Sequence, residues 1–285
     1  TACRTMLPSM RALEKARDKM YLNQLLRSHG VAVPDAFPFW KTLEWGAAPD
    51  RMWVRARTGA GSKAALPVKS LRQARHWVDY WCEMRGLKPD DFMVSEFLPG
   101  KEYAWQGVYR DGQLYASVAR TRDEYVFAEQ MPSGQSSTPS VATIVHSDEV
   151  NGLAESAVAA IDERPNGVYG VDCKTGADGR VKVTEINAGR FYTTSDFYAA
   201  AGCNLPDLWA QLASGDSFYR AVSTPLRDEI PAGTTWIRSL DREPMLVKPE
   251  PSAPRYTITG LGDLITDFAE ANRLAKDMAR AWACL

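Results

Sequence analysis

The sequence has few of the features that mark a secreted, zinc-binding or membrane protein. Its cysteines and histidines are scattered and include no CxxC pair: Cys3, Cys82, Cys173, Cys203, Cys284, His29, His76 and His146. We therefore expect reduced thiols, as in a cytoplasmic protein, with no zinc site and no Ser/His or Cys/His relay. No run of about 18 apolar residues is present, so we expect no membrane-spanning helix.

The charges are nearly balanced, with 34 Lys and Arg against 35 Asp and Glu, which indicates neither a nucleic-acid partner nor an anionic membrane surface.

The 285 residues are enough for one large or two smaller hydrophobic cores. Helices and antiparallel strands alternate in blocks, which predicts an α+β fold of two lobes. Helices are expected at 9–29, 71–84, 148–162, parts of 191–215 and 263–282, and strands at 52–54, 91–98, 103–108, 114–120 and in both arms of 168–187.

The most informative segment is a predicted β-hairpin with Asp178-Gly179 at its tip. This dipeptide favours a two-residue type I′ turn. The resulting register places Asp172 directly opposite Glu185. Asn187 follows two residues later, so its side chain points to the same face as that of Glu185.

Two opposed carboxylates repel each other, so this face is expected to hold something positive. Mg²⁺ takes oxygen ligands of this kind and usually shares them with substrate phosphates, which makes the patch a candidate nucleotide–metal site. Spacing alone leaves a second interpretation open, in which the face is solvated and Lys174 and Lys182 neutralise the carboxylates.

Glycines and basic residues cluster after the strand predicted at 52–54: Arg55, Arg57, Gly59, Gly61 and Lys63. Glycines let backbone N–H groups approach phosphate oxygens, and the basic side chains add charge-assisted hydrogen bonds. The pattern is neither a P-loop nor a Rossmann fingerprint. Alone, it is explained at least as well by an ordinary glycine turn with solvated arginines.

The strand ending at Ser95 to Leu98 runs into Pro99-Gly100 and leaves backbone groups free. An adenine edge can pair with such groups, and Glu102 could accept hydrogen bonds from ribose hydroxyls. A plain strand end is the alternative.

Three arginines are candidates to bind an oxyanion with their guanidinium groups: Arg120, Arg122 and Arg190. The alternative is that they are ordinary surface arginines.

Taken in order, these elements resemble the ATP-grasp superfamily over roughly residues 15–240. The Asp-x12-Glu-x-Asn spacing is similar to that of D-alanine–D-alanine ligase, and the arginine of Val54-Arg55 resembles carbamoyl phosphate synthetase large chains. The remaining parts of the match are Asp18-Lys19 before Gly30-Val31-Ala32-Val33-Pro34, Trp53-Val54-Arg55 before the glycine turn, and Met93 to Leu98.

The resemblance implies two α+β lobes that clasp ATP, and it assigns roles to particular residues. Lys19 and Arg55 would contact the ATP phosphates, under a mobile flap at 58–63 that includes Gly59, Gly61 and Ser62. Glu96, Phe97 and Leu98 would hold adenine, and Glu102 the ribose. Asp172, Glu185 and Asn187 would hold one or two Mg²⁺ ions, for which Mn²⁺ could substitute. Arg190, together with Arg55, would act in catalysis by stabilising the transferred phosphoryl group, although it follows Asn187 by three residues rather than in the tighter Asn-Pro-Arg pattern.

The activity implied is ATP-dependent activation of a small carboxylate as an acyl phosphate, which an amine then attacks. Two alternatives stay open: a carbamoyl-phosphate-synthase-like enzyme that uses bicarbonate, and a non-catalytic ATP-binding module. Substrate contacts are expected from Ser133 to Ser137, Arg120, Arg122, Tyr192 and Thr193.

The resemblance also implies an N-terminal Rossmann-like domain, which is absent or truncated because only a helix precedes Lys19. We expect a fragment of a longer protein, or a substrate-site floor supplied by a partner domain. A homo-oligomer is a separate possibility that the sequence leaves open. The predicted organisation is an N-terminal helical segment (1–30), a small lobe with the phosphate flap (31–95), a large lobe with the metal site (96–245) and a C-terminal helical segment (246–285).

Overall fold

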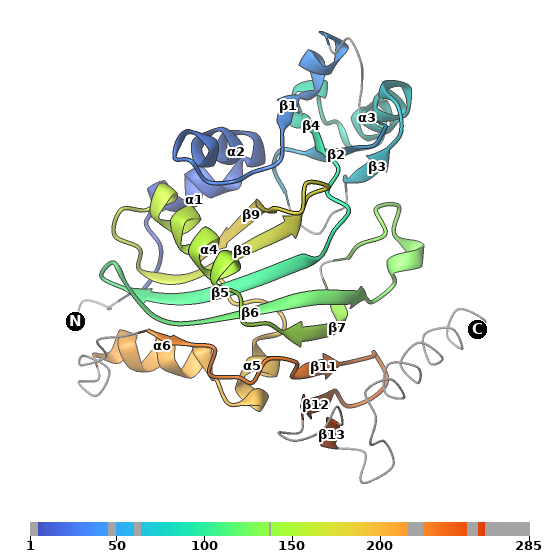
Figure 1. Ribbon diagram of the computed structural model, residues 1–285. Helices are drawn as coiled ribbons and strands as arrows, with labels where there is room; N and C mark the ends of the chain where they lie inside the picture. The colour runs from blue at the N-terminus through green and yellow to red at the C-terminus, as the bar shows by residue number, and fades with distance from the viewer. Residues whose placement is uncertain are drawn as a thin grey trace.

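The computed structural model describes residues 5–44, 50–59, 64–136, 138–215, 225–249 and the backbone of 256–259, which form two lobes built on two β-sheets (Figure 1). The smaller sheet is antiparallel, in the order β1 (Ala36–Pro38), β4 (Phe92–Glu96), β2 (Met52–Ala56) and β3 (Leu66–Val68). The larger sheet runs β13-β12-β11-β7-β6-β5-β8-β9, with β10 beside β6. This is the α+β fold of two lobes that the sequence predicts.

The strands of the larger sheet are antiparallel apart from the short pairing of β10 with β6. Their bounds are β5 (Glu102–Arg110), β6 (Gln113–Tyr125), β7 (Pro139–Ile144), β8 (Gly167–Thr175), β9 (Val181–Ala188), β10 (Leu226–Arg227), β11 (Thr235–Ile237), β12 (Met245–Pro249) and β13 (Tyr256–Thr259).

Helices cover both faces of the larger sheet. One hydrophobic core packs α1 (Met10–Arg17), α2 (Lys19–Ser28) and α4 (Asp148–Ile161) against one face, and a second packs α5 (Ser195–Ala201) and α6 (Leu205–Ser214) against the other. Side chains alternate along a strand. Because Val171 and Cys173 lie in the core beneath α4, Asp172 between them points to the face that carries α5.

The smaller sheet is covered by α3 (Leu71–Arg85). Ser70 caps the start of this helix by accepting a hydrogen bond from the backbone N–H of Gln73, and Gly86 ends it in the left-handed region with φ 67°. Three short 3₁₀ turns complete the described elements: η1 (Phe39–Glu44), η2 (Pro89–Asp91) and η3 (Ala128–Gln130).

The helical structure expected at 9–29 is confirmed, but it is divided into two helices that meet at Asp18. Asp18 adopts an extended conformation, and its carboxylate accepts hydrogen bonds from the backbone N–H groups of Met20 and Tyr21, so it caps α2. The same carboxylate pairs with Arg57 beyond β2, at 2.6 Å. The cap therefore fixes Lys19 in the first turn of α2, beside the smaller sheet.

The β8–β9 hairpin places Asp172 opposite Glu185, as predicted, but the predicted two-residue turn is wrong. The backbone N–H of Gly176 donates to the carbonyl of Arg180, so the turn has three residues, and within it only Gly179 takes a positive φ. Asp178 keeps the negative φ that is usual for a non-glycine residue, and its carboxylate accepts hydrogen bonds from Arg180. A β-bulge at Thr184 takes up the extra residue and restores the register.

In the segment expected to be helical at 246–285, the described residues form strands, β12 and β13. The helix expected at 263–282 lies outside the described residues. No helix in the described ranges is long and apolar enough to cross a membrane.

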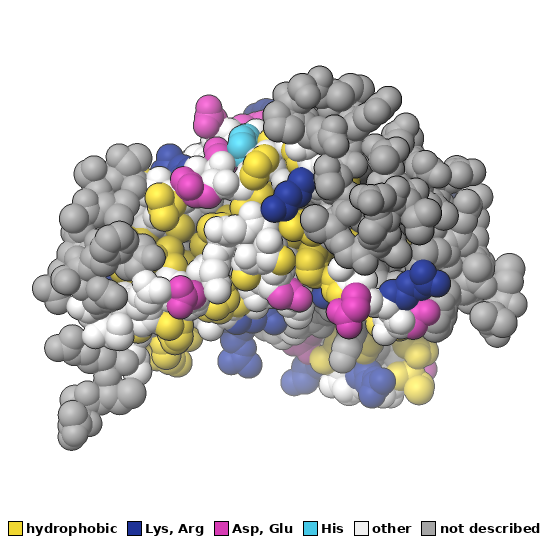
Figure 2. All heavy atoms as spheres, turned by 90° about the horizontal axis from the view of Figure 1, so that it is seen from below, with side chains coloured by type: hydrophobic (Ala, Val, Ile, Leu, Met, Phe, Trp, Pro, Cys, Tyr) yellow, Lys and Arg dark blue, Asp and Glu magenta, His cyan; other side chains and the backbone are white. Residues whose placement is uncertain are grey.

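Figure 2 views the face on which α5 and α6 lie, where basic and acidic side chains are interspersed with apolar ones. The described part of this face therefore concentrates no charge of one sign.

Gly107 on β5 is required by the packing of Trp105. A Cβ atom on Gly107 would lie 2.3 Å from Cη2 of the fully buried Trp105 ring. We expect Gly107→Ala to lower the free energy of unfolding by about 1–3 kcal/mol, as measured by chemical denaturation. The matched control is Gly152→Ala on the exposed side of α4, where an added Cβ meets nothing within 4 Å. Gly152→Ala should raise the free energy of unfolding by about 1 kcal/mol. Equal free energies of unfolding in the two variants would contradict the packing of Trp105 against Gly107.

Candidate functional site

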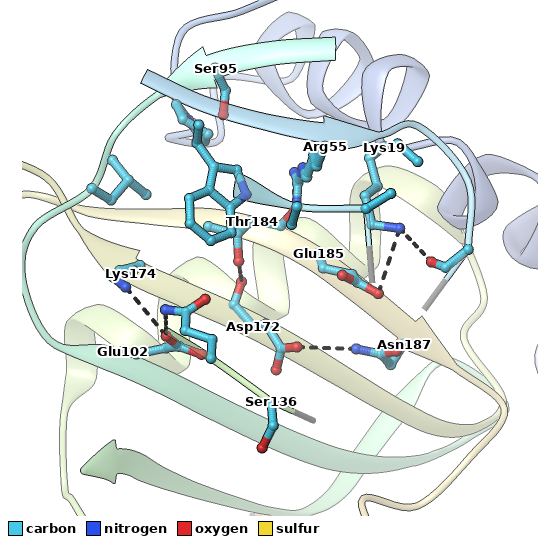
Figure 3. Close-up of a pocket in the computed structure, with 18 of the residues that line it drawn as sticks. Lys19, Arg55, Ser95, Glu102, Ser136, Asp172, Lys174, Thr184, Glu185 and Asn187 are labelled. Carbon is cyan, nitrogen blue, oxygen red and sulfur yellow. Dashed lines mark hydrogen bonds and ion pairs between the residues drawn. The ribbon is translucent and has the colours of Figure 1, made fainter. Parts of the chain in front are cut away.

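A cavity of about 540 Å³ is lined by residues of both lobes (Figure 3). It contains five basic side chains, Lys19, Arg55, Arg122, Lys174 and Arg190, and four acidic ones, Glu96, Glu102, Asp172 and Glu185. Residues far apart in the sequence thus meet here, from the start of α2 to the segment before α5. Nearly all the predicted site residues of the described chain line this cavity.

The predicted metal ligands lie together on β8 and β9. Asp172 and Glu185 are paired across the hairpin, and the side-chain amide of Asn187 donates to Oδ2 of Asp172 at 3.3 Å (Figure 3). Within the described ranges no group of three or more His, Cys, Asp or Glu side chains could hold a metal by itself. Two carboxylates and an amide oxygen nevertheless fit Mg²⁺, which binds through one or two carboxylates and completes its shell with water and substrate phosphates.

Lys19 and Arg55 face these carboxylates. The Nζ of Lys19 donates to the carbonyl of Gly59 at 2.7 Å and lies 4.0 Å from Glu185 (Figure 3). Burial lowers the pKa of Lys19, and Glu185 only partly offsets this effect. Arg55 donates to the carbonyl of Thr184 at 2.9 Å, but its buried Nε has no partner among the described residues. Both cations are thus incompletely paired, as expected at a site for an anionic ligand.

The bulge at Thr184 connects the two sets of charges. It offers its carbonyl oxygen to Arg55, while its hydroxyl donates to the carbonyl of Asp172 at 3.0 Å. The bulge therefore fixes the edge of β9 against β2 and holds Glu185 in register with Asp172. Sequence reasoning missed this residue, because no turn or glycine signal marks the position.

Glu102 is held more tightly than its expected ribose role suggests. Its Oε1 accepts hydrogen bonds from Arg122, at 2.9 Å, and from the hydroxyl of Tyr125. Its Oε2 accepts from Gln135 at 2.9 Å and from Lys174 at 3.4 Å. Burial would raise the pKa of Glu102, but Arg122 and Lys174 outweigh burial and hold it below its usual value. Tyr125 was missed because its contact joins β5 and β6 across 23 residues. Gln135 lies in the loop expected to contact substrate, but here it binds Glu102.

Arg122 contacts two carboxylates rather than lying free to clamp an oxyanion. It pairs with Asp172 at 2.7 Å as well as with Glu102. Tyr192 also donates to Asp172, at 2.8 Å, and lines the cavity with Thr193. Arg120 is fully buried and does not line the cavity; it donates to Tyr198 and Thr194.

The other expected contacts are distributed as follows. Arg190 donates to Oδ1 of Asn187 and lines the cavity. The lining also includes Glu96, Phe97 and Leu98 at the expected adenine edge, together with Trp53, Trp81, Gly59 and Ser136. The carboxylate of Glu96 is bound by Lys182, with both distances 2.8 Å. Gly61, Ser62 and Ser137 lie outside the described residues.

The structure is thus two-lobed, and Lys19 and Arg55 face the carboxylates of β8 and β9 across one cavity. The family model described as "ATP-grasp in the biosynthetic pathway with Ter operon" matches residues 88–231, half of the chain. The chain belongs to this family. The resemblance seen in the sequence is thereby confirmed.

Solved structures show the same fold. The D-alanine–D-alanine ligase from Coxiella burnetii matches with a TM-score of 0.53 at 19% identity, over 74% of this chain and 60% of that one. The L-amino acid ligase from Bacillus licheniformis matches with a TM-score of 0.55 at 16% identity, over 87% of this chain and 57% of that one. Biotin carboxylase from Campylobacter jejuni matches with a TM-score of 0.60 at 12% identity, over 82% of this chain and 52% of that one. The chain thus spans between half and three fifths of these structures. No curated protein matches the sequence.

Proposed function

We propose that this chain is an ATP- and Mg²⁺-dependent ligase that activates a small carboxylate as an acyl phosphate for attack by an amine. One observation carries the proposal: Lys19 and Arg55 face Asp172, Glu185 and Asn187 across a single cavity. Two of the structures named above are amino acid ligases, which supports this class of reaction. We assign the phosphate flap to the lobe at 31–95 and metal binding to the lobe at 96–245.

The basic residues would bind the phosphates. Lys19 and Arg55 present N–H groups to the cavity from α2 and β2, and each has bonding capacity left for phosphate oxygens. Asp172, Glu185 and Asn187 would hold Mg²⁺, which supplies charge neutralisation on the β- and γ-phosphates when bound. Glu96, Phe97 and Leu98 would hold the base along the end of β4, and Glu102 the ribose.

The reaction would proceed in two transfers. The γ-phosphoryl group passes from ATP to a carboxylate oxygen, which breaks its bond to ADP. Arg190 would stabilise the negative charge of the transferred group, because its guanidinium lines the cavity beside Asn187. An amine nitrogen then attacks the acyl carbon and displaces inorganic phosphate, with loss of a proton from the amine. None of these steps uses a covalent protein nucleophile.

Phosphate release from Mg·ATP, screened against pools of amino acids, small carboxylates and bicarbonate, tests this proposal. We expect release that requires a carboxylate pool and rises when an amine pool is added. Release driven by bicarbonate alone would favour a carbamoyl-phosphate-synthase-like enzyme instead. Mg·ATP binding with no release in any pool would favour a non-catalytic ATP-binding module or a chain that needs a partner domain.

Trp53 offers a test of base binding. It lies on β2 opposite Ser95, and its side chain lines the cavity with Glu96 and Leu98. Stacking of a base on an aromatic ring contributes about 1–3 kcal/mol. We therefore expect Trp53→Ala to raise the Kd for Mg·ATP about 10-fold, as measured by calorimetry.

The control for this substitution is Trp40→Ala, at an exposed site that does not line the cavity. It should leave the Kd unchanged. An unchanged Kd in Trp53→Ala would place the base elsewhere in the cavity.

A further inference from the structure

Arg122 bridges the metal end and the ribose end of the cavity. One arm of its guanidinium donates to Asp172 at 2.7 Å and the other to Glu102 at 2.9 Å. Its side chain is only 10% exposed, and the two carboxylates are 15% and 16% exposed. An arginine fork buried between two carboxylates is a well-defined pairing rather than a loose surface contact.

This pairing leaves Asp172 with little capacity for a cation. Its Oδ1 accepts hydrogen bonds from Arg122 and Tyr192, and its Oδ2 accepts one from Asn187. Arg122 remains charged at any accessible pH, since Asp172 and Glu102 outweigh the effect of burial and raise its pKa well above the usual value. A divalent cation that approaches Asp172 therefore meets a fixed positive charge.

The second carboxylate has a basic neighbour too. Glu185 lies 4.0 Å from Lys19, and Arg55 adds a further, partly buried positive charge that acts on both carboxylates. In the chain without nucleotide, the repulsion between Asp172 and Glu185 is thus balanced by the protein's own cations. The excess positive charge of the lining is instead available to the phosphates of a nucleotide.

We propose that Arg122 is a positioning residue that keeps divalent metal out of the nucleotide-free site, so that metal enters only together with a nucleoside triphosphate. The phosphates would offset the charge of Arg122 and supply the remaining oxygen ligands. This inference rests on the proposed function for the identity of the ligand, Mg·ATP. The role of Arg122 itself rests on its contacts.

Binding of Mn²⁺ to the full chain tests this proposal without any turnover. Binding is measured as the decrease in the EPR signal of free Mn²⁺. We expect weak Mn²⁺ binding to the unaltered chain alone and strong binding once a non-hydrolysable ATP analogue is added. Arg122→Met should bind Mn²⁺ at least about 10-fold more tightly in the absence of nucleotide, because one neighbouring charge shifts ionic equilibria by one to three powers of ten. Arg122→Lys, which keeps the charge, should behave like the unaltered chain.

Two further variants locate the effect. Arg122→Met combined with Glu185→Gln should lose the gained Mn²⁺ affinity, which assigns the ion to this site. Arg122→Gln keeps hydrogen-bond donors between the carboxylates but no charge, so it replaces Arg122→Met if circular dichroism shows that the methionine variant is unfolded. Equal nucleotide-free Mn²⁺ affinity in the unaltered chain and in the folded, uncharged variant would overturn the proposal. Failure of the unaltered chain to bind the analogue would contradict the proposed function, while the nucleotide-free comparison would still decide the role of Arg122.

Discussion

Replacement of Glu185 by Gln is expected to lower the rate of phosphate release from Mg·ATP by about 10²–10³-fold. The carboxylate lies across the hairpin from Asp172 and close to Lys19 and Arg55, and among the described residues only Lys19 forms an ion pair with it. It is therefore the proposed ligand most available to a metal ion at this site. Loss of its charge would remove electrostatic stabilisation where the phosphoryl group would be transferred.

The fold should survive this change, because Glu185 is partly exposed and glutamine has nearly the same shape. The matched control is Asp178→Asn on the same hairpin, whose carboxylate pairs with Arg180 and Lys182 outside the cavity. It should leave the rate unchanged. Asp172→Asn should cause a loss similar to that of Glu185→Gln. Normal turnover in both cavity variants would remove the metal assignment.

Replacement of Arg190 by Met is expected to lower kcat by about 10³-fold while the Kd for Mg·ATP changes less than about fivefold. Arg190 lies beside Asn187 at the point where the γ-phosphoryl group would be transferred. An arginine that stabilises the charge of a transferred phosphoryl group contributes 10³–10⁵ in rate. Because this stabilisation acts mainly in the transition state, ground-state binding changes little.

Arg180→Met, at the exposed tip of the β8–β9 hairpin, is the control for Arg190→Met and should change neither kcat nor the Kd for Mg·ATP. Single-turnover kinetics and calorimetry together separate the two effects. If the Kd of Arg190→Met rises in parallel with the fall in kcat/KM, then Arg190 contributes to binding of ATP and not to phosphoryl transfer.

The pairing of Asp172 with Glu185 was predictable, although the turn that should produce it was predicted wrongly. Alternation of apolar residues fixes which face each strand buries, and this constraint acts over the whole of β8 and β9. The three-residue turn shifts the register by one position, and the bulge at Thr184 shifts it back. Such compensation leaves no local signal, since a bulge depends on contacts such as the one between Arg55 and the Thr184 carbonyl.

The break between α1 and α2 could have been predicted. Asp18 is a strong N-cap residue, and its position directly before Lys19 explains why that lysine begins a helix rather than continuing one. Apolar spacing runs through both helices and therefore hides the boundary. The cap was the better guide, because it reflects hydrogen bonds that only a helix start leaves open.

The network around Glu102 could not be predicted from local patterns. Its partners are separated from it by 20 to 72 residues, and they meet because β5 lies between β6 and β8 in the larger sheet. Sequence reasoning found Arg122 as a basic residue of interest but assigned it to substrate. Only the strand order shows that its guanidinium lies between Asp172 and Glu102.

Trapping with hydroxylamine tests the central claim most directly, namely that the chain makes an acyl phosphate. Hydroxylamine replaces the amine and converts an acyl phosphate to a hydroxamate, which is detected with iron(III). We expect hydroxamate to form only with Mg·ATP and a carboxylate pool, in amounts equal to the ADP released, and to fall with Glu185→Gln. Release of ADP and phosphate without any hydroxamate, in the presence of every carboxylate pool, would contradict the proposed reaction.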